Sequence, residues 1–435
     1  KKSPAAAYAA PVQAIAGAAP AAAQPTIDAA NPRVVQMVQQ YRPQYQRLLK
    51  LAQAITAAKR RPFFVLGGHG PSPDPAYFMK ISGADAVVLG EGEVTIVELA
   101  AALAAGTKKF AGIKGLAWRD GKKTVVNAPR PLVADIDTLP LPAYEMFPME
   151  YYRLIRFPHV PGNAFALPVL SARGCVFQCN FCYRMDKGYR PRGAAAIIEE
   201  VRLLQREYGI TYVNFSDELF MASVARTEEL CTAFLKAKLK FHWWCSGRLN
   251  FAKPDVLKLM KKAGCVFINY GIEAMDDAVL KTMRKNLTVQ QIRTGIDATL
   301  AAGISPGFNI IYGHIGDTRA TLEKAVQYLL EKCDSSQYRT IRPVTPYPGS
   351  PLYYEAIKRG LLRDCADFYE NKHTNSDLLA INFTDMSDAE VHQALYEANC
   401  RLTDHYYALK AQEAKQQFAA LYSGKAKNFR GVRQT

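Results

Sequence analysis

Short apolar runs and longer amphipathic stretches alternate six times between Leu167 and about Pro343, which predicts strands followed by helices. Gly209, Gly264 and Gly303 each follow one of the amphipathic stretches, as glycines at helix ends do. Six strand–helix units predict a partial (β/α)6 TIM-like barrel, whose active site gathers at the carboxyl ends of the strands. The predicted strands span residues 167–173, 211–215, 241–246, 266–272, 307–312 and 338–343, and the helices 194–208, 224–238, 253–263, 288–302 and 318–332.

A second α/β pattern precedes the barrel. A short apolar strand from Pro62 to Leu66 ends in a glycine-rich turn, and a second one from Ala84 to Leu89 ends in the run Gly-Glu-Gly-Glu. Strands that alternate with helices imply a parallel sheet, and ligands of such sheets bind beyond the carboxyl ends of the strands. The other elements expected here are a strand over 33–38 and helices over about 45–59 and 95–104.

The rest of the chain separates these units. Pro129 to Pro148 is rich in proline and is expected to form an extended linker. Near the C-terminus, Ser387 and Glu390 have the spacing of a capping box, which predicts a helix that runs to about Lys410. We therefore expect an α/β protein in three parts. These are a Rossmann-like domain over 1–140, a partial barrel over 141–351 and a helical region over 352–435.

Three cysteines, Cys175, Cys179 and Cys182, follow the first barrel strand in a C-x3-C-x2-C pattern. Three thiolates on one loop can hold three corners of a [4Fe–4S] cluster, which usually takes four cysteines, so one iron would stay open for another ligand. Packed core thiols are one alternative. A zinc site is another, but it needs a fourth ligand, typically from a second C-x2-C or an H-x3-H, and the sequence contains neither spacing.

Composition and charge narrow the picture only a little. The net charge of +16 would suit nucleic acid, but the basic residues are dispersed, so we do not expect nucleic-acid binding. No run of 18 strongly apolar residues predicts a transmembrane helix. The alanine-rich start is too weakly apolar, and too often interrupted by proline, for a targeting signal. Six further cysteines stand singly, which favours reduced thiols and a cytoplasmic protein.

The cysteine loop, with Phe181 just before its last cysteine, resembles the signature of radical S-adenosylmethionine (SAM) enzymes. The resemblance implies that SAM chelates the open iron and that one electron from the cluster cleaves it to a 5′-deoxyadenosyl radical. An electron donor such as flavodoxin or ferredoxin would then be a partner. Polar motifs at successive strand ends are similar to the SAM contacts of the family, in the same order. The SAM contacts implied are Phe181, Tyr183, Ser216, Asp217, Glu218, Arg248, Glu273 and Asn309.

The run Gly313-His314-Ile315-Gly316-Asp317-Thr318 is similar to a family motif, but His314 and Ile315 replace Leu-Pro. The two N-terminal glycine turns resemble the cobalamin-binding domain that many such enzymes carry. No apolar strand precedes the alanine-rich start, so we expect this domain to lack its first strand. No Asp-x-His-x-x-Gly motif offers a lower axial histidine. The cobalamin contacts implied are Gly67, Gly68, His69, Gly90, Glu91 and Gly92.

The resemblance implies a cobalamin-dependent radical SAM methyltransferase that acts on an unactivated carbon of a small or medium organic substrate. A cyclase or oxidoreductase with the same cofactors is the alternative. A tRNA-modifying enzyme suits the net charge, but the related enzymes carry N-terminal cysteines and an RNA-binding domain that this sequence does not show. A pure electron carrier would close its cluster with a fourth cysteine. No catalytic side chain is singled out, although Tyr312 and Tyr347 are candidates for donors of a proton or hydrogen atom. The basic residues after the loop, which suit either an anionic substrate or a solvated face, are Arg184, Lys187, Arg190 and Arg192.

Overall fold

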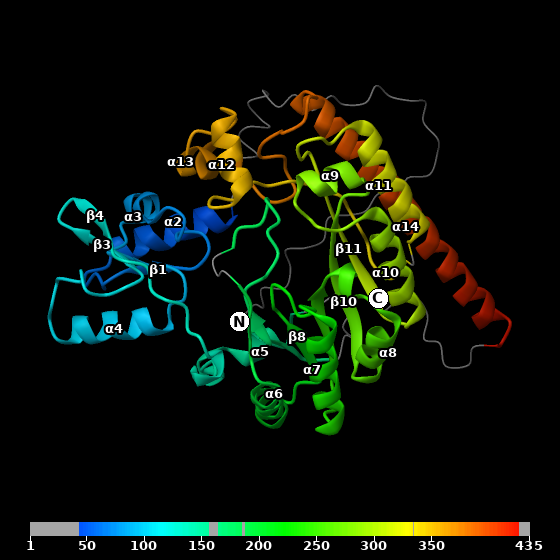
Figure 1. The fold of residues 1–435 in the computed structure, drawn as a ribbon, viewed down its shortest axis with the longest axis horizontal. Coiled ribbons are helices and arrows are strands. Elements are labelled where there is room, and N and C mark those ends of the chain that lie inside the picture. The colour runs from blue at the N-terminus through cyan, green and yellow to red at the C-terminus, as the bar shows by residue number, and fades with distance from the viewer. Residues whose placement is uncertain (1–42, 156–163, 185–187, 334, 426–435) are drawn as a thin grey trace, which may run out of the picture.

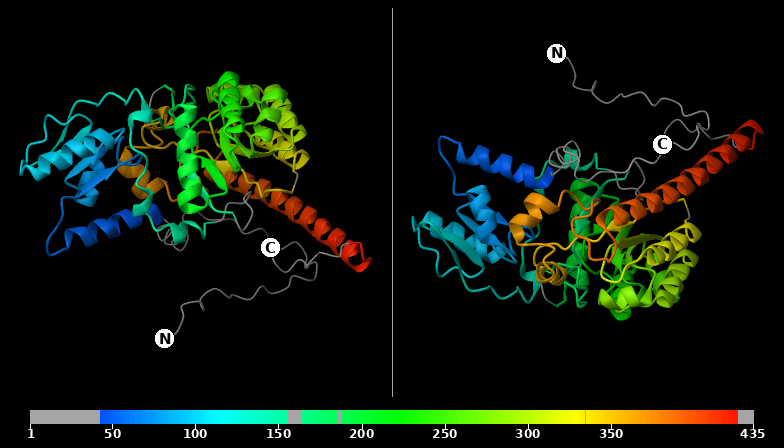
Figure 2. Two further views of the ribbon diagram at one scale, coloured as in Figure 1. Left: turned by 90° about the horizontal axis from the view of Figure 1, so that it is seen from below. Right: turned by 90° about the horizontal axis from the view of Figure 1, so that it is seen from above.

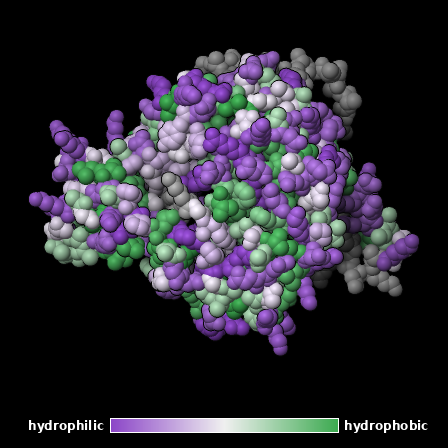
Figure 3. Space-filling view, viewed as in Figure 1, coloured by the Kyte–Doolittle hydropathy of each residue, from purple (hydrophilic) through white to green (hydrophobic). Residues whose placement is uncertain are grey.

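The computed structural model describes residues 43–155, 164–184, 188–333 and 335–425. Figure 1 shows a small N-terminal α/β body beside a larger body built on a curved sheet, with the helices α12 and α13 above the junction. The strand predicted over 33–38 and the expected loss of a first strand concern residues outside the described ones. Hydrophilic side chains are spread over the face of both bodies that Figure 3 shows.

The N-terminal sheet has the strand order β1-β2-β3-β4. β1 and β2 run parallel, with Val65 opposite Ala86, and both end in the predicted glycine turns. β3 and β4 form an antiparallel hairpin that the sequence analysis missed, so the sheet is mixed rather than wholly parallel. The strands are β1 (Val65–Gly67), β2 (Ala86–Val88), β3 (Leu116–Asp120) and β4 (Lys123–Val126), and the helices are α2 (Pro43–Thr56), α3 (Pro75–Ser82) and α4 (Glu93–Ala104).

The larger sheet is parallel throughout, in the order β12-β11-β10-β9-β8-β5. Its helices cover the outer side of the curve, and the sheet is an open half-barrel, as predicted (Figures 1 and 2). The strands are β5 (Ala166–Val169), β8 (Tyr212–Phe215), β9 (His242–Gly247), β10 (Cys265–Glu273), β11 (Ser305–Tyr312) and β12 (Arg342–Pro343). The helices are α6 (Ala194–Tyr208), α7 (Val224–Lys236), α8 (Pro254–Lys262), α10 (Val289–Ala301) and α11 (Arg319–Glu331).

Local signals explain where the barrel helices begin and end. Thr288 and Thr318 close capping boxes at the starts of α10 and α11. Gly209, Gly264 and Gly303 have positive φ angles just past three helices, as expected. At Gly264 a Cβ would also lie 2.4 Å from the backbone oxygen of Phe241, so no larger residue fits this turn. The glycines lie just before the strands β8, β10 and β11, and the two threonines lie after β10 and β11, so these caps set both ends of the strand–helix units.

Short elements and a long helix complete the fold. The helix α14 (Asp388–Tyr422) starts at the predicted Ser387 capping box but runs 12 residues beyond the predicted end at Lys410. Its buried residues all lie between Val391 and Leu402, and Figure 2 shows the remainder projecting from the body. None of the described helices combines the length and apolar character needed to cross a bilayer. The short elements are β6 (Ala172–Arg173), β7 (Arg190–Pro191), η1 (Ile136–Thr138), η2 (Tyr144–Met146), α5 (Met149–Tyr152), η3 (Leu249–Phe251), α9 (Asp277–Thr282), α12 (Pro351–Lys358), α13 (Cys365–Asp367) and the π-helix η4 (Phe368–Lys372).

Candidate active site

The three-cysteine loop connects the two short strands β6 and β7, which form a ribbon at its base. β6 and β7 pair antiparallel, with Arg173 directly opposite Arg190, so the loop between them is closed at its base. Gly174 begins the loop with a φ of 81°, a left-handed turn that favours glycine. The loop therefore lies at the carboxyl end of the first barrel strand, where the sequence analysis expected it.

Two of the three thiols interact directly. A hydrogen bond from Cys182 lowers the pKa of Cys179 to about 6 and, together with burial, raises that of Cys182. Burial raises the pKa of Cys175. Across the described ranges, no three His, Cys, Asp or Glu side chains converge on one metal ion. A cubane cluster does not require such convergence, because each of its irons takes a separate thiolate. The donor set fits a [4Fe–4S] cluster.

Asn180 fastens the middle of the loop to three surrounding elements. Its backbone N–H donates to Met283 O (3.1 Å), and its carbonyl accepts from Leu352 N (2.8 Å). Its side-chain amide donates to Thr282 O (3.0 Å), and its Oδ1 lies 3.0 Å from His314 Nε2. His314 is fully buried, and burial lowers its pKa to about 4, so it is neutral at pH 7. The residue that departs from the family motif thus supports the cluster loop.

Arg248, which the sequence analysis assigned to the SAM carboxylate, also contacts the loop. Its guanidinium lies 3.5 Å from the centre of the Phe177 ring, and its Nη1 lies 3.8 Å from Cys179 Sγ. Its Nη2 donates to the carbonyl of Lys285. A buried cation beside the thiols favours their ionised form, which is the form that binds iron.

Glu273 lies at a bulge near the end of β10, with a φ of 68°. Its Oε1 accepts a hydrogen bond from Lys285 Nζ at 2.8 Å, and both side chains are buried. A Cβ at Gly271 would lie 2.3 Å from that carboxylate oxygen, so only glycine fits beside this ion pair. Lys285 was missed in the sequence analysis because it follows a short helix, outside any strand-end motif.

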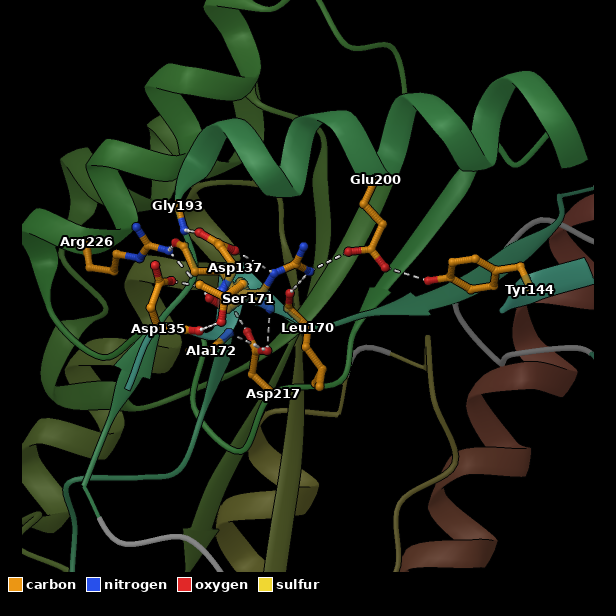
Figure 4. A network of polar contacts seen from close by, with 12 residues as sticks. Asp135, Asp137, Tyr144, Leu170, Ser171, Ala172, Gly193, Glu200, Asp217 and Arg226 are labelled. Carbon is orange, nitrogen blue, oxygen red and sulfur yellow. Dashed lines mark hydrogen bonds and ion pairs between the residues drawn. The ribbon is translucent and has the colours of Figure 1, made fainter. Parts of the chain in front are cut away.

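The polar run after β8 divides between the interior and a cavity. Asp217 is buried and accepts hydrogen bonds from Ser171 N (2.7 Å), Ala172 N (3.1 Å) and the Ser171 hydroxyl (Figure 4). These bonds explain why the single strand predicted over 167–173 is divided into β5 and β6. Ser216 and Glu218 instead are exposed and line a cavity of about 320 Å³. Those two side chains therefore belong to the wall of this cavity.

Asn309 is the last of the predicted SAM contacts. It is exposed on β11, and its amide donates to Asn269 Oδ1 (2.7 Å) and to the carbonyl of Tyr270 (3.1 Å). The oxygen of its side chain therefore faces away from the neighbouring strand. These two bonds join the Asn309 side chain on β11 to residues of β10.

The glycine turns of the N-terminal sheet face the barrel. Gly68 and Gly90 have positive φ angles, and a Cβ at either would meet no atom within 4 Å, which leaves room for a ligand against the backbone. Gly90 and Gly92 line the 320 Å³ cavity, and Gly67 ends β1. Glu93 Oε2, on the same wall, is buried without a hydrogen-bond partner among the described residues. The amide groups of cobalamin would supply such a donor, so this wall fits that cofactor.

A larger cavity, of about 750 Å³, lies between the glycine turn after β1 and the cluster loop. His69 from the N-terminal sheet and Cys182 from the cluster loop both line it. The rings of His69 and Tyr183 meet edge to face with their centroids 5.8 Å apart. Tyr347 also lines this cavity, and its hydroxyl lies 2.7 Å from Ser376 Oγ. Tyr312 is buried and contacts Met386, away from the cavity residues.

Several charged residues have different positions from those expected. Glu91 forms ion pairs with Arg173 and Arg190, each at 2.8 Å, and its side chain is only 5% exposed. Arg192 pairs with Asp137 and Glu200. The prediction that the arginines after the loop attract an anion or form a solvated face is therefore wrong for Arg190 and Arg192, because carboxylates of the protein already neutralise them. Arg184 donates to the carbonyl of Phe177, and Lys187 lies outside the described residues.

The fold and this site match two known families. Residues 169–329 match the Radical SAM superfamily, and residues 14–100 match the B12 binding domain. The chain therefore contains a radical SAM domain joined to a B12-binding domain. The first implies a [4Fe–4S] cluster and SAM, and the second implies cobalamin.

Individual relatives agree with this assignment. An uncharacterised methyltransferase of Pyrococcus horikoshii is 32% identical over 69% of this chain and 64% of its own length. The anaerobic magnesium-protoporphyrin IX monomethyl ester cyclase of Cereibacter sphaeroides is 29% identical over 67% of this chain and 47% of its own length. The structure of the radical SAM methyltransferase TsrM from Kitasatospora setae has the same fold, with a TM-score of 0.63 at 19% identity over 82% of this chain and 75% of that one. The chain thus spans between about half and two thirds of the length of these two sequence relatives.

Proposed function

We propose that this protein is a cobalamin-dependent radical SAM methyltransferase that acts on an unactivated carbon of a small or medium-sized organic molecule. One observation carries the proposal: the 750 Å³ cavity is lined by Cys182 of the cluster loop and by His69 of the B12-binding domain. A substrate in that cavity would lie between the two cofactors. When bound, the cluster and SAM supply a radical that removes a hydrogen atom, and methylcobalamin supplies the methyl group.

The chain's own residues hold and shield this arrangement. Cys175, Cys179 and Cys182 would bind three irons, and Asn180 fixes the loop between them. Arg248 keeps a positive charge beside the thiols. Among the predicted residues that line the 320 Å³ cavity, Ser216 and Glu218 are the SAM contacts we favour. The further SAM contacts we propose are Phe181, Tyr183, Glu273 and Asn309. Asp217 would support the site indirectly, because it holds the backbone of Ser171 and Ala172.

The relatives support methyl transfer over other outcomes. Several of them are named methyltransferases, including the one from Pyrococcus horikoshii. A cyclase remains the second candidate, because the enzyme from Cereibacter sphaeroides is nearly as similar in sequence. All nine cysteines of this chain are free. We therefore place the reaction in a reducing cytoplasm, with a low-potential donor such as flavodoxin or ferredoxin.

Anaerobic reconstitution with iron, sulfide and hydroxocobalamin tests the proposal. We expect a bound cluster and a bound corrin in absorption spectra, 5′-deoxyadenosine after reduction with dithionite, and label from methyl-labelled SAM in the bound cobalamin. Cys179→Ala should abolish deoxyadenosine formation, whereas Cys400→Ala, on the distant helix α14, should not. A protein that binds no corrin, and forms deoxyadenosine equally well without cobalamin, would contradict the proposal. Transfer of the label to a product separates a methyltransferase from a cyclase.

A further inference from the structure

We propose that Glu91 is a positioning residue that clamps the base of the cluster loop to the B12-binding domain and so couples cobalamin binding to cluster binding. The inference rests on the proposed function for its two cofactors. It differs from the sequence analysis, which assigned Glu91 to cobalamin itself.

The geometry of the ribbon supports the clamp. Arg173 stands two residues before the first cluster cysteine, and Arg190 lies directly opposite it on β7. The loop with all three cysteines is the connection between these two arginines. Both guanidiniums reach the carboxylate of Glu91, at 2.8 Å each. One side chain of the N-terminal body therefore holds both ends of the cluster loop.

Two neighbouring contacts reinforce the clamp. Glu91 also accepts a hydrogen bond from the backbone N–H of Val133, in the proline-rich linker, at 2.8 Å. The second nitrogen of Arg173 pairs with Glu93 at 2.6 Å. The linker, the N-terminal body and the cluster ribbon thus meet at one carboxylate. A shift of any one of them changes the bonds of the other two.

Burial gives these contacts their strength. The side chains of Glu91, Arg190 and Arg173 are 5%, 14% and 21% exposed. Burial raises the pKa of the Glu91 carboxyl, but hydrogen bonds from Arg190 and Arg173 outweigh it, so the pKa lies below its ordinary value. Glu91 is ionised at pH 7. Removing its charge would leave two partly buried guanidiniums with one partner fewer, which is a large perturbation.

Glu91 also belongs to the glycine turn that we assign to cobalamin binding. Gly90 and Gly92, on either side of Glu91, line the 320 Å³ cavity, and Gly90 leaves open space beyond its Cα. A ligand seated on this turn would touch the backbone that carries the clamp. If the ligand favours the clamped arrangement, the clamp favours the ligand by the same factor, because coupling between two sites is reciprocal.

A first experiment needs no cofactor. The thiols of the apoprotein are alkylated under anaerobic conditions, and the modification rates of the three loop cysteines are followed by mass spectrometry. Glu91→Gln keeps the shape of the side chain and removes its charge, so we expect the loop to open more often and Cys175 to react at least about 5-fold faster. Glu98→Gln is the matched control, because Glu98 pairs with Arg130 of the linker and not with either arginine of the ribbon. Unchanged rates in Glu91→Gln would overturn the proposal.

A second experiment measures the coupling itself. Iron release from the reconstituted protein to a chelator is followed with and without hydroxocobalamin. In the wild type and in Glu98→Gln we expect cobalamin to slow the release at least about 5-fold, the low end of measured couplings between sites. In Glu91→Gln we expect each cofactor still to bind, but the effect of cobalamin on iron release to disappear.

The outcomes separate this inference from the proposed function. If the wild type binds no corrin, both are overturned. If both cofactors bind and Glu91→Gln keeps the full coupling, only the clamp is overturned. Arg190→Gln guards against misfolding of the first variant. This variant removes the guanidinium that pairs with Glu91, so it should also lose the effect of cobalamin on iron release. The double variant of Glu91 and Arg190 should differ little from either single variant.

Discussion

Asp217 uses both of its carboxylate oxygens within the protein. Oδ1 accepts from two successive backbone N–H groups, those of Ser171 and Ala172, and Oδ2 accepts from the Ser171 hydroxyl. Burial raises the pKa of Asp217 to about 6, although these hydrogen bonds act in the opposite direction. The residue that shapes the start of the cluster ribbon is therefore half-protonated near pH 6.

This pKa predicts how stability depends on pH. The folded chain holds the proton more tightly than the unfolded chain, whose Asp titrates near 3.8. The stabilising effect of the proton is thus present below pH 4 and is lost as the pH rises through 6, a change of about 3 kcal/mol. Asp217→Asn removes the charge and keeps an oxygen that accepts from the Ser171 and Ala172 N–H groups. Its NH2 group replaces Oδ2 and donates to the Ser171 hydroxyl oxygen, as the protonated carboxyl does. We expect it to raise the urea midpoint at pH 7 and to leave it nearly unchanged at pH 4.

The control for this prediction is an exposed carboxylate. Glu199→Gln, on the outer face of α6, should leave the urea midpoint at both pH values within error, because surface charges contribute little. An Asp217→Asn protein with the same dependence on pH as the wild type would show that Asp217 does not titrate in this range.

At the scale of residues, the sequence identified several functional side chains but not the residues that they contact. The spacing of the cysteines located the loop, because three thiols within eight residues leave few alternatives. The clamp role of Glu91 was not predictable, since Arg173 and Arg190 are 82 and 99 residues away from it in sequence. Lys285 was missed for another reason: it follows a short helix, outside the strand-end motif that contains its partner Glu273.

At the scale of elements, the barrel helices were the most predictable part. α6 begins and ends where its periodicity indicates, and α10 and α11 differ from prediction by one residue at each end. The β3–β4 hairpin was missed although Asp120-Gly121 is a turn signal between two apolar runs. The helix α3 was missed because it has only eight residues, too few for a clear helical period.

The loop after β12 carries the second prediction. Gly349 has a φ of 89°, and a Cβ there would lie 2.5 Å from the ring of Tyr183 and 3.1 Å from Pro73. We expect Gly349→Ala to push Tyr183 away from its place beside Cys182 and to lower the iron bound per chain after reconstitution. Gly360→Ala is a matched control, because Gly360 has a similar φ of 70° but open space around it.

Both alanines force a left-handed backbone, which costs about 1–2 kcal/mol. The unfolding temperature should therefore fall in both variants, and at least as far in Gly349→Ala, which adds the contact with Tyr183. Only Gly349→Ala should lose iron. Equal iron content in both would show that the contact between this loop and Tyr183 does not support the cluster loop.

At the scale of the whole molecule, two groups of contacts help to attach the N-terminal body to the rest of the chain. The Glu91 clamp is one attachment. The other is an aromatic cluster around Tyr369 of η4, which stacks on Tyr45 and Tyr77 with centroids 6.0 and 6.2 Å away, and meets Phe78 edge to face. The Tyr77 hydroxyl also donates to Glu370 at 3.1 Å. The C-terminal region thus fixes the B12-binding domain to the barrel, a contact between residues almost 300 apart in sequence that no local pattern reveals.

Loss of the aromatic attachment should loosen the two bodies without unfolding either. We expect Tyr369→Ala to increase proteolytic cleavage of the linker between Pro129 and Pro148 several-fold, because a protease cuts where the chain opens. Tyr369→Phe keeps the stacked ring and should behave like the wild type, and Tyr354→Ala, an exposed tyrosine on α12, should do the same. The iron content of Tyr369→Ala should remain normal, since the Glu91 clamp still holds the cluster ribbon. If Tyr369→Ala instead loses iron while the linker stays protected, the aromatic cluster supports the barrel rather than the junction between the two bodies.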